Sequence, residues 1–234
     1  MRLNAILAGC ALAFAALHAA ADPVSGSTQG TWVDPNPSAS PIVVTGVGTS
    51  QFTWGRAAGT PTPNILTFTA AAGGFSSVTE TPFKVGSISY YNGTTASGTT
   101  PDSIQLALTL DFTDPAIPAV TSDYTFKLVS TPNGGQDPDA DADYVYLPSA
   151  FSATSFVIGS TTYNVKLTGF EDIVGDGFLT SDDLSFHVRE NGTASADLFA
   201  VVTTQTAVPE PQSVALMLAG LGMMGLLARR RGRG

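Results

Sequence analysis

The sequence predicts an all-β protein, with a single antiparallel β-sandwich of jelly-roll-like type over residues 22–207. Three observations favour this fold class. This region contains many short runs of alternating or β-branched residues. None of its long windows has the 3.6-residue apolar period of a helix. The chain has 24 glycines and 15 prolines, which divide these runs into segments of sandwich length. A closed barrel is the alternative arrangement of the same strands.

The predicted strands are short, and most are separated by Gly, Pro, Asn or Asp. Alternation is clearest in residues 104–112, where Ile, Leu and Phe face one side and Gln and Asp face the other. Gly159 and Ser160 lie between two strands and predict a two-residue hairpin turn. The predicted strands are residues 42–47, 51–54, 65–69, 85–91, 103–113, 124–130, 144–147, 155–158, 162–168, 184–189 and 196–203.

Residues 1–21 predict a secretory signal peptide that directs the chain to the Sec machinery. A basic start and an apolar run are followed by three alanines, which favours cleavage between Ala21 and Asp22. A short membrane anchor is one alternative, and acylation of Cys10 in a lipobox-like sequence is another. Cleavage removes the chain's one cysteine and leaves His187 as its one histidine. The exported part could then form neither a disulfide nor a Cys/His zinc site.

Residues 208–234 combine three features in a fixed order. Pro209, Glu210 and Pro211 come first, and the apolar residues 214–228 follow. As a helix this apolar segment would be about 22 Å long, shorter than the ~30 Å hydrocarbon core, and we expect a short transmembrane helix in a thinned bilayer. A basic cluster places the C-terminal end in the cytoplasm and the body outside. Its members are Arg229, Arg230, Arg231 and Arg233.

This three-part tail resembles the PEP-CTERM sorting signal of Gram-negative bacteria. The resemblance implies that the chain is anchored transiently in the inner membrane and is processed there by an exosortase, a membrane protease-transpeptidase. It also implies that Pro209, Glu210 and Pro211 are a recognition motif for that enzyme and not a catalytic site. After processing, the body would be released or transferred to the cell surface or an exopolysaccharide matrix.

The region between the two signals resembles the choice-of-anchor K domain of exported bacterial proteins. The resemblance extends over most of residues 28–203 and implies an extracellular domain that occurs with different surface-anchoring tails. It supplies no catalytic or binding residues. The stretches that carry it are residues 30–32, 46–55, 81–86, 130–133 and 142–145.

The charge of the predicted exported region is strongly negative. Residues 22–208 contain eighteen acidic and five basic side chains, a net charge of −13. This charge repels phosphate backbones and argues against a nucleic-acid partner. It is compatible with divalent cations or with solubility outside the cell.

One acidic segment is a candidate calcium site. Asp137, Asp139 and Asp141 alternate in a segment that follows Gly134 and Gly135, and hard carboxylate oxygens in a loop suit Ca²⁺. The segment departs from the EF-hand pattern, because Ala142 stands where that pattern requires glycine. A solvated acidic loop is the alternative, and we expect no other cofactor.

The sequence therefore predicts an exported, noncatalytic protein with a structural or adhesive role. Six aromatic side chains are candidates for stacking on sugar rings, and core or edge packing is the alternative for most of them. They are Trp32, Trp54, Tyr90, Tyr91, Tyr144 and Tyr146. A Ca²⁺-stabilised adhesion module and a polysaccharide-binding or polysaccharide-active extracellular protein are the alternatives. The enzymatic alternative rests on an acidic segment that could supply the paired carboxylates of glycoside hydrolysis. Its residues are Glu171, Asp172, Asp176, Asp182 and Asp183.

Overall fold

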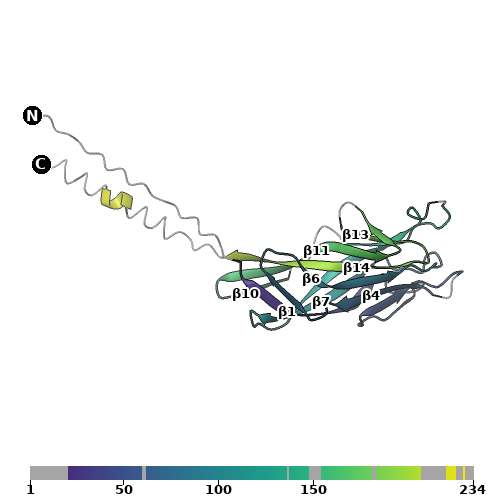
Figure 1. Cartoon of the computed structure of the whole chain (residues 1–234), viewed down its shortest axis with the longest axis horizontal. Coiled ribbons are helices and arrows are strands. Elements are labelled where there is room, and N and C mark those ends of the chain that lie inside the picture. Colours follow the sequence, from purple (N-terminus) through teal and green to yellow (C-terminus); the bar gives the residue numbers. More distant parts are fainter. Residues whose placement is uncertain are drawn as a thin grey trace, which may run out of the picture.

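The protein is an all-β sandwich of two curled antiparallel sheets (Figure 1). A computed structural model describes residues 21–59, 62–135, 137–147, 154–180, 183–206, 220–224 and 229. Every pair of adjacent strands is antiparallel. The predicted all-β antiparallel class is therefore confirmed. Among the described residues, each sheet has seven strands, so both sheets are wider than those of an eight-stranded jelly roll.

Sheet 1 has the strand order β12-β13-β9-β8-β7-β1-β5. β7, β8 and β9 follow one another as hairpins, whereas β1 lies between β7 and β5. The bounds are β12 Gly177–Leu179, β13 Ser185–Val188, β9 Asp143–Tyr146, β8 Val120–Val129, β7 Ser103–Asp114, β1 Pro23–Asn36 and β5 Phe75–Val78.

Sheet 2 has the strand order β10-β11-β14-β6-β4-β3-β2. The last strand, β14, occupies a central position between β11 and β6. The predicted hairpin turn is confirmed, because Ile158 of β10 pairs with Thr161 of β11 across Gly159 and Ser160. The bounds are β10 Thr154–Ile158, β11 Thr161–Gly175, β14 Thr193–Thr206, β6 Phe83–Tyr91, β4 Asn64–Ala70, β3 Gln51–Trp54 and β2 Val44–Thr45.

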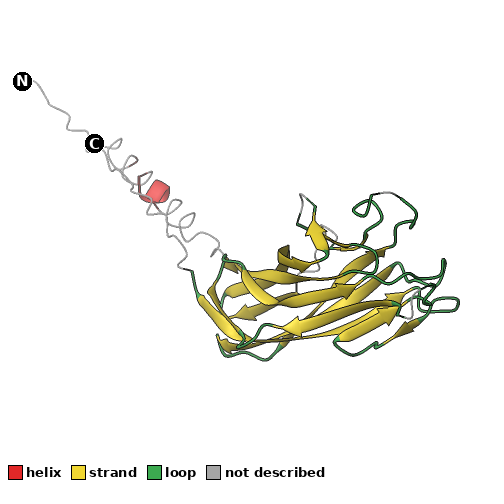
Figure 2. Ribbon diagram, turned by 45° about the vertical axis from the view of Figure 1, so that its right-hand side comes forward, coloured by secondary structure: helices red, strands yellow, loops and turns green. Residues whose placement is uncertain are grey.

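The two sheets lie face to face (Figure 2). Among the described residues, one hydrophobic core fills the space between them. Alternate residues of β7, from Ile104 to Phe112, are buried, as the period-two pattern predicts. Aromatic rings join the sheets across the core. Phe75 of β5 stacks on Phe83 of β6 with ring centroids 4.5 Å apart, and Phe126 of β8 lies 6.2 Å from Phe170 of β11.

The longest strand that the sequence prediction missed is β1, which runs for 14 residues near the edge of sheet 1. Its buried positions include Val24, Thr28, Gly30 and Trp32. This face alternates correctly but contains a polar residue and a glycine, so it lacks the usual signal of a buried strand.

The sheets approach closely where Gly30 of β1 faces β4. A Cβ atom on Gly30 would lie 2.5 Å from Cδ1 of the Phe68 ring, and one on Gly86 would lie 2.6 Å from Cζ of the same ring. The ring of Phe68 therefore occupies the space that two absent side chains leave open. This explains why a glycine stands at a buried position in the middle of a strand.

The two ends of the sandwich carry different segments of the chain. The Thr79 N–H donates to the Asp22 carbonyl oxygen at 2.8 Å, and the Glu80 N–H donates to the Val202 carbonyl oxygen at 2.8 Å. The start of β1 and the end of β14 thus meet at one end, which we name the anchor end. β14 extends from there for about 43 Å at ~3.3 Å per residue. The opposite end, the distal end, carries the turn that precedes Thr193 (Figure 1).

Substitution of Gly30 tests the close approach of the sheets. We expect Gly30→Ala to lower the free energy of unfolding by about 1–3 kcal/mol, because the new methyl group overlaps the Phe68 ring. Thr31→Ala, at the next position on the outer face, should change it by less than about 0.5 kcal/mol. Urea denaturation measures both. Addition of Phe68→Leu should restore part of the loss in Gly30→Ala, and equal stability of Gly30→Ala and wild type would contradict this account.

Candidate functional site

The predicted sorting motif, Pro209, Glu210 and Pro211, lies outside the described residues, as do Arg230, Arg231, Arg233 and residues 1–20 of the predicted signal peptide. Of the predicted transmembrane segment, only residues 220–224 are described; they are helical, and Leu221, Met223 and Met224 are exposed. Arg229 is described and exposed. Within the described part of the chain, no helix has the length and apolar character needed to cross a membrane.

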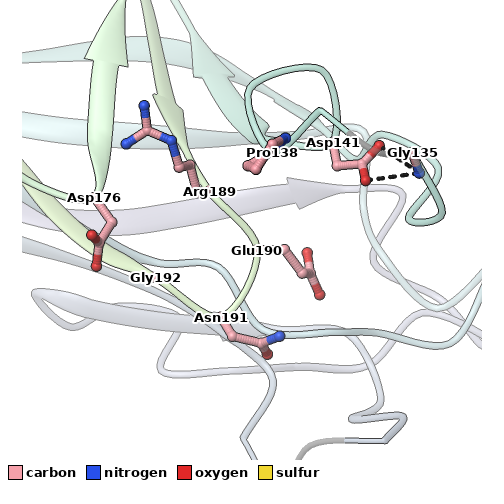
Figure 3. A pocket seen from close by; sticks show the side chains of 8 residues that line it. All are labelled: Gly135, Pro138, Asp141, Asp176, Arg189, Glu190, Asn191 and Gly192. Carbon is pink, nitrogen blue, oxygen red and sulfur yellow. Dashed lines mark hydrogen bonds between the residues drawn. The ribbon is translucent and has the colours of Figure 1, made fainter.

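The distal end holds a polar hollow with a volume of about 450 Å³ (Figure 3). It lies between the loop that precedes β9 and the turn that joins β13 to β14. Its volume falls within the range of about 300–1,000 Å³ that small-molecule sites occupy. The lining residues are Gly135, Pro138, Asp141, Asp176, Arg189, Glu190, Asn191 and Gly192.

A second hollow of about 550 Å³ lies at the same end and is lined mainly by hydroxyl and amide groups. The Thr94 hydroxyl donates to the Glu190 carboxylate, so a residue of this hollow contacts a residue of the first. The two hollows together form a surface that we name the distal hollows. The second is lined by Thr94, Thr95, Ala96, Ser97, Gly98, Thr100, Ser130, Thr131, Pro132 and Asn133.

The three candidate calcium ligands have separate partners. An oxygen of the Asp137 carboxylate accepts a hydrogen bond from the Asp139 N–H at 3.0 Å. The Asp139 carboxylate is 2.6 Å from Nε of Arg189, and the Asp141 carboxylate accepts from the Gly135 N–H at 2.9 Å. Among the described residues, no group of three or more His, Cys, Asp or Glu side chains is placed to hold a metal ion. The calcium site stays a prediction.

A buried carboxyl group lies beneath the distal hollows. Asp143 is 4% exposed and accepts hydrogen bonds from the N–H of Thr131 at 2.7 Å and from its hydroxyl at 3.2 Å. Burial raises the pKa of Asp143 to about 6, although the hydrogen bond from the Thr131 N–H opposes the increase. Burial also raises the pKa of Tyr90, and the charges of Asp143 and Glu190 add to this increase.

Asp143 was not singled out by the sequence reasoning, although a signal was present. It shares one face of β9 with Val145, which is fully buried, and alternation places both side chains toward the core. The other aspartates of the acidic segment come before the strand begins.

Aromatic side chains on the outer face form a stack across β12, β13 and β9, the first three strands at one edge of sheet 1. The ring of His187 on β13 lies 4.3 Å from that of Tyr144 on β9 and 4.8 Å from that of Phe178 on β12, and both pairs are stacked. The guanidinium of Arg189 lies 5.6 Å from the Phe178 centroid. His187 therefore covers one face of the Tyr144 ring, and that face is not open to a sugar. Of the other predicted stacking residues, Trp32, Trp54 and Tyr90 are buried in the core.

The second acidic segment is not one loop, as the sequence prediction supposed. Glu171 and Asp172 belong to β11 and lie at an irregularity in its pairing with β14. Asp176 lies in the turn between β11 and β12 and lines the first distal hollow, and Asp182 lies outside the described residues.

The turn at Asn191 and Gly192 joins β13 of sheet 1 to β14 of sheet 2, so it is not a hairpin.

The comparison with protein families identifies the end of the chain. The family described as the PEP-CTERM protein-sorting motif matches residues 207–231. The chain carries a PEP-CTERM sorting motif. This motif indicates a protein that transits the membrane, is processed by an exosortase and ends up exported or on the cell surface. A search of curated proteins found no match to the chain.

The position of Asp143 predicts a specific dependence of stability on pH. Because its folded pKa is about 6 and the reference value is 3.8, the folded state binds the proton more tightly than the unfolded state. The contribution of Asp143 to stability should therefore fall as pH rises from about 4 to 6. Asp143→Asn should remove this contribution. The melting temperatures of the wild type and Asp143→Asn between pH 4 and 7 measure this contribution. Parallel curves for the two proteins would contradict the raised pKa of Asp143.

Proposed function

We propose that the β-sandwich is a noncatalytic structural or adhesive domain that works at the cell surface or in the exopolysaccharide matrix. The observation that carries this proposal is the PEP-CTERM motif at residues 207–231, which begins directly after the last strand ends at Thr206. The sorted cargo is therefore the sandwich itself. We place it with the choice-of-anchor K type of domain that its sequence resembles, and we expect residues 1–21 to be removed as a signal peptide.

The arrangement of the two ends supports an adhesive role. β14 connects the sorting motif to the distal end, so the distal hollows are presented about 43 Å from the motif. Loops held away from an anchor by rigid strands are common positions for binding residues. The hydroxyl and amide groups of the second hollow match the hydrogen-bonding groups of a sugar chain. The carboxylates of the first hollow favour a neutral polysaccharide over an anionic one.

One observation favours a polysaccharide-active enzyme as the second candidate. Asp141, Asp176 and Glu190 line the same hollow, and paired carboxylates are the chemical requirement for glycoside hydrolysis. The carboxylates of Asp141 and Glu190 already accept hydrogen bonds, from Gly135 and Thr94 respectively, which supports a structural task for both. Release of reducing ends from a panel of neutral polysaccharides would favour the enzyme.

Removal of the sorting segment tests the proposed destination. We expect deletion of residues 209–234 to abolish appearance of the protein at the cell surface and in the matrix, because the exosortase then lacks its recognition motif. Cell fractionation and immunodetection of the body measure the change. A second variant replaces only Pro209 and Pro211 by alanine. It tests the recognition motif separately from the rest of the tail, which stays in place. Undiminished matrix protein in the deletion strain would contradict the proposal.

Substitutions in the distal hollows test the adhesive role. Asn191 has a positive φ of 59°, so Asn191→Gly removes the side-chain amide and keeps the backbone conformation accessible. Together with Asn133→Ala, it should weaken cosedimentation of the processed protein with neutral matrix polysaccharide by about tenfold or more, since two hydrogen-bonding amides are lost. Gln29→Ala, on the outer face of β1, should leave cosedimentation unchanged. Equal cosedimentation of the wild type, the double variant and Gln29→Ala would contradict a polysaccharide site at the distal hollows.

A further inference from the structure

The sorting motif leaves the folded domain with very little free chain before it. β14 ends at Thr206, and only Ala207 and Val208 separate its last paired residue from Pro209. On one side, the end of β14 is paired with β11, where Tyr163 lies opposite Thr204 and Thr161 lies opposite Thr206. An enzyme that acts near Pro209 therefore meets a strand that is still hydrogen-bonded.

On its other side, the end of β14 has no paired strand, and its backbone groups form hydrogen bonds with Glu80 instead. Pairing between β14 and β6 stops at Ala200 and Phe83. Beyond this point the Glu80 N–H donates to the Val202 carbonyl oxygen, and the Thr204 N–H donates to the Glu80 carboxylate, both at 2.8 Å. One residue thus supplies the acceptor and the donor that the next strand would otherwise provide.

The same turn also holds the N-terminal end of the sandwich. The Asp22 N–H donates to the Thr79 hydroxyl at 2.9 Å, and the Thr79 N–H donates back to the Asp22 carbonyl oxygen at 2.8 Å. The Tyr163 hydroxyl donates to the Asp22 carboxylate at 3.1 Å. We name the set Asp22, Thr79, Glu80 and Tyr163, with its contacts to Val202 and Thr204, the terminal clamp. It links the predicted cleavage site, at Asp22, to the last residues of β14, which precede the sorting motif in the sequence.

We infer that the terminal clamp sets the rate at which the sorting motif is processed. A protease acts on an extended segment that is free of other backbone partners, so its rate follows the population of the open form. The clamp and β11 keep β14 paired up to Thr206, and its last residues become free only when these pairs open. Glu80 is therefore a positioning residue for exosortase processing. This inference rests on the proposed destination, because it requires that an exosortase processes the chain.

The test compares full-length variants expressed in a strain that contains the exosortase, with pulse-chase measurement of tail removal. Glu80→Ala should accelerate processing about two- to tenfold, the equivalent of one net hydrogen bond in the opening equilibrium. Glu80→Gln retains a side-chain acceptor for the Thr204 N–H and should process at the wild-type rate. Asp111→Ala removes another exposed carboxylate from β7, outside the clamp, and should also match wild type.

A second variant leaves every residue of the clamp in place. Insertion of a short Gly-Ser linker between Thr206 and Ala207 supplies free chain without opening the strand, so it should accelerate processing to a similar extent. In the linker background, Glu80→Ala should have no further effect. Wild-type rates for both the linker variant and Glu80→Ala would overturn the inference. If Glu80→Ala does not accumulate as folded protein, the linker variant alone decides. Retention of the tail by the wild type would instead contradict the proposed destination.

Discussion

The packing of two sheets against one aromatic core is the interaction on which the rest of the structure depends. The one cysteine, Cys10, lies within the predicted signal peptide, so no disulfide can join the sheets after cleavage. The contacts between Phe75 and Phe83 and between Phe126 and Phe170 do this instead. The close approach at Gly30 allows Phe68 to fill the space between the sheets. Every loop at the distal end is positioned by strands that this core holds in place.

β14 connects the core to the proposed function. It is the last strand in the chain but lies in the middle of sheet 2, where β11 and β6 flank it. Its first residues follow the turn that lines a distal hollow, and its last residues precede the sorting motif. A strand with partners on both sides keeps its register, because a slip by one residue would turn its buried face outward.

The sequence predicted strands where a strand carries a regular apolar face. Residues 51–54 coincide with β3, and residues 103–113 differ from β7 by one residue. β1 was missed because its buried face contains Thr28 and Gly30. β5 was missed because two serines stand between its apolar ends, and β12 because it is only three residues long. β11 continues past residue 168 because irregularities at Gly169 and near Asp172 let it bend and keep its pairing with β14.

The candidate site was less accessible to sequence reasoning than the fold. The tail could be identified because its residues act as a linear motif, which needs no folded geometry. The distal hollows are built from four connecting segments that meet only in three dimensions. Side-chain partners such as Asp139 and Arg189 are fifty residues apart. The alternating aspartates correctly marked an acidic loop, but their spacing did not reveal that Asp143 alone turns inward.

The central claim is that this sandwich is exported and that an exosortase processes its tail. Mass spectrometry of the native protein from the surface and matrix fractions tests this most directly. The account predicts a body that starts at Asp22 and ends close to Pro209, without the arginine cluster at residues 229–233. A protein in these fractions that still carries its C-terminal arginines would contradict the claim.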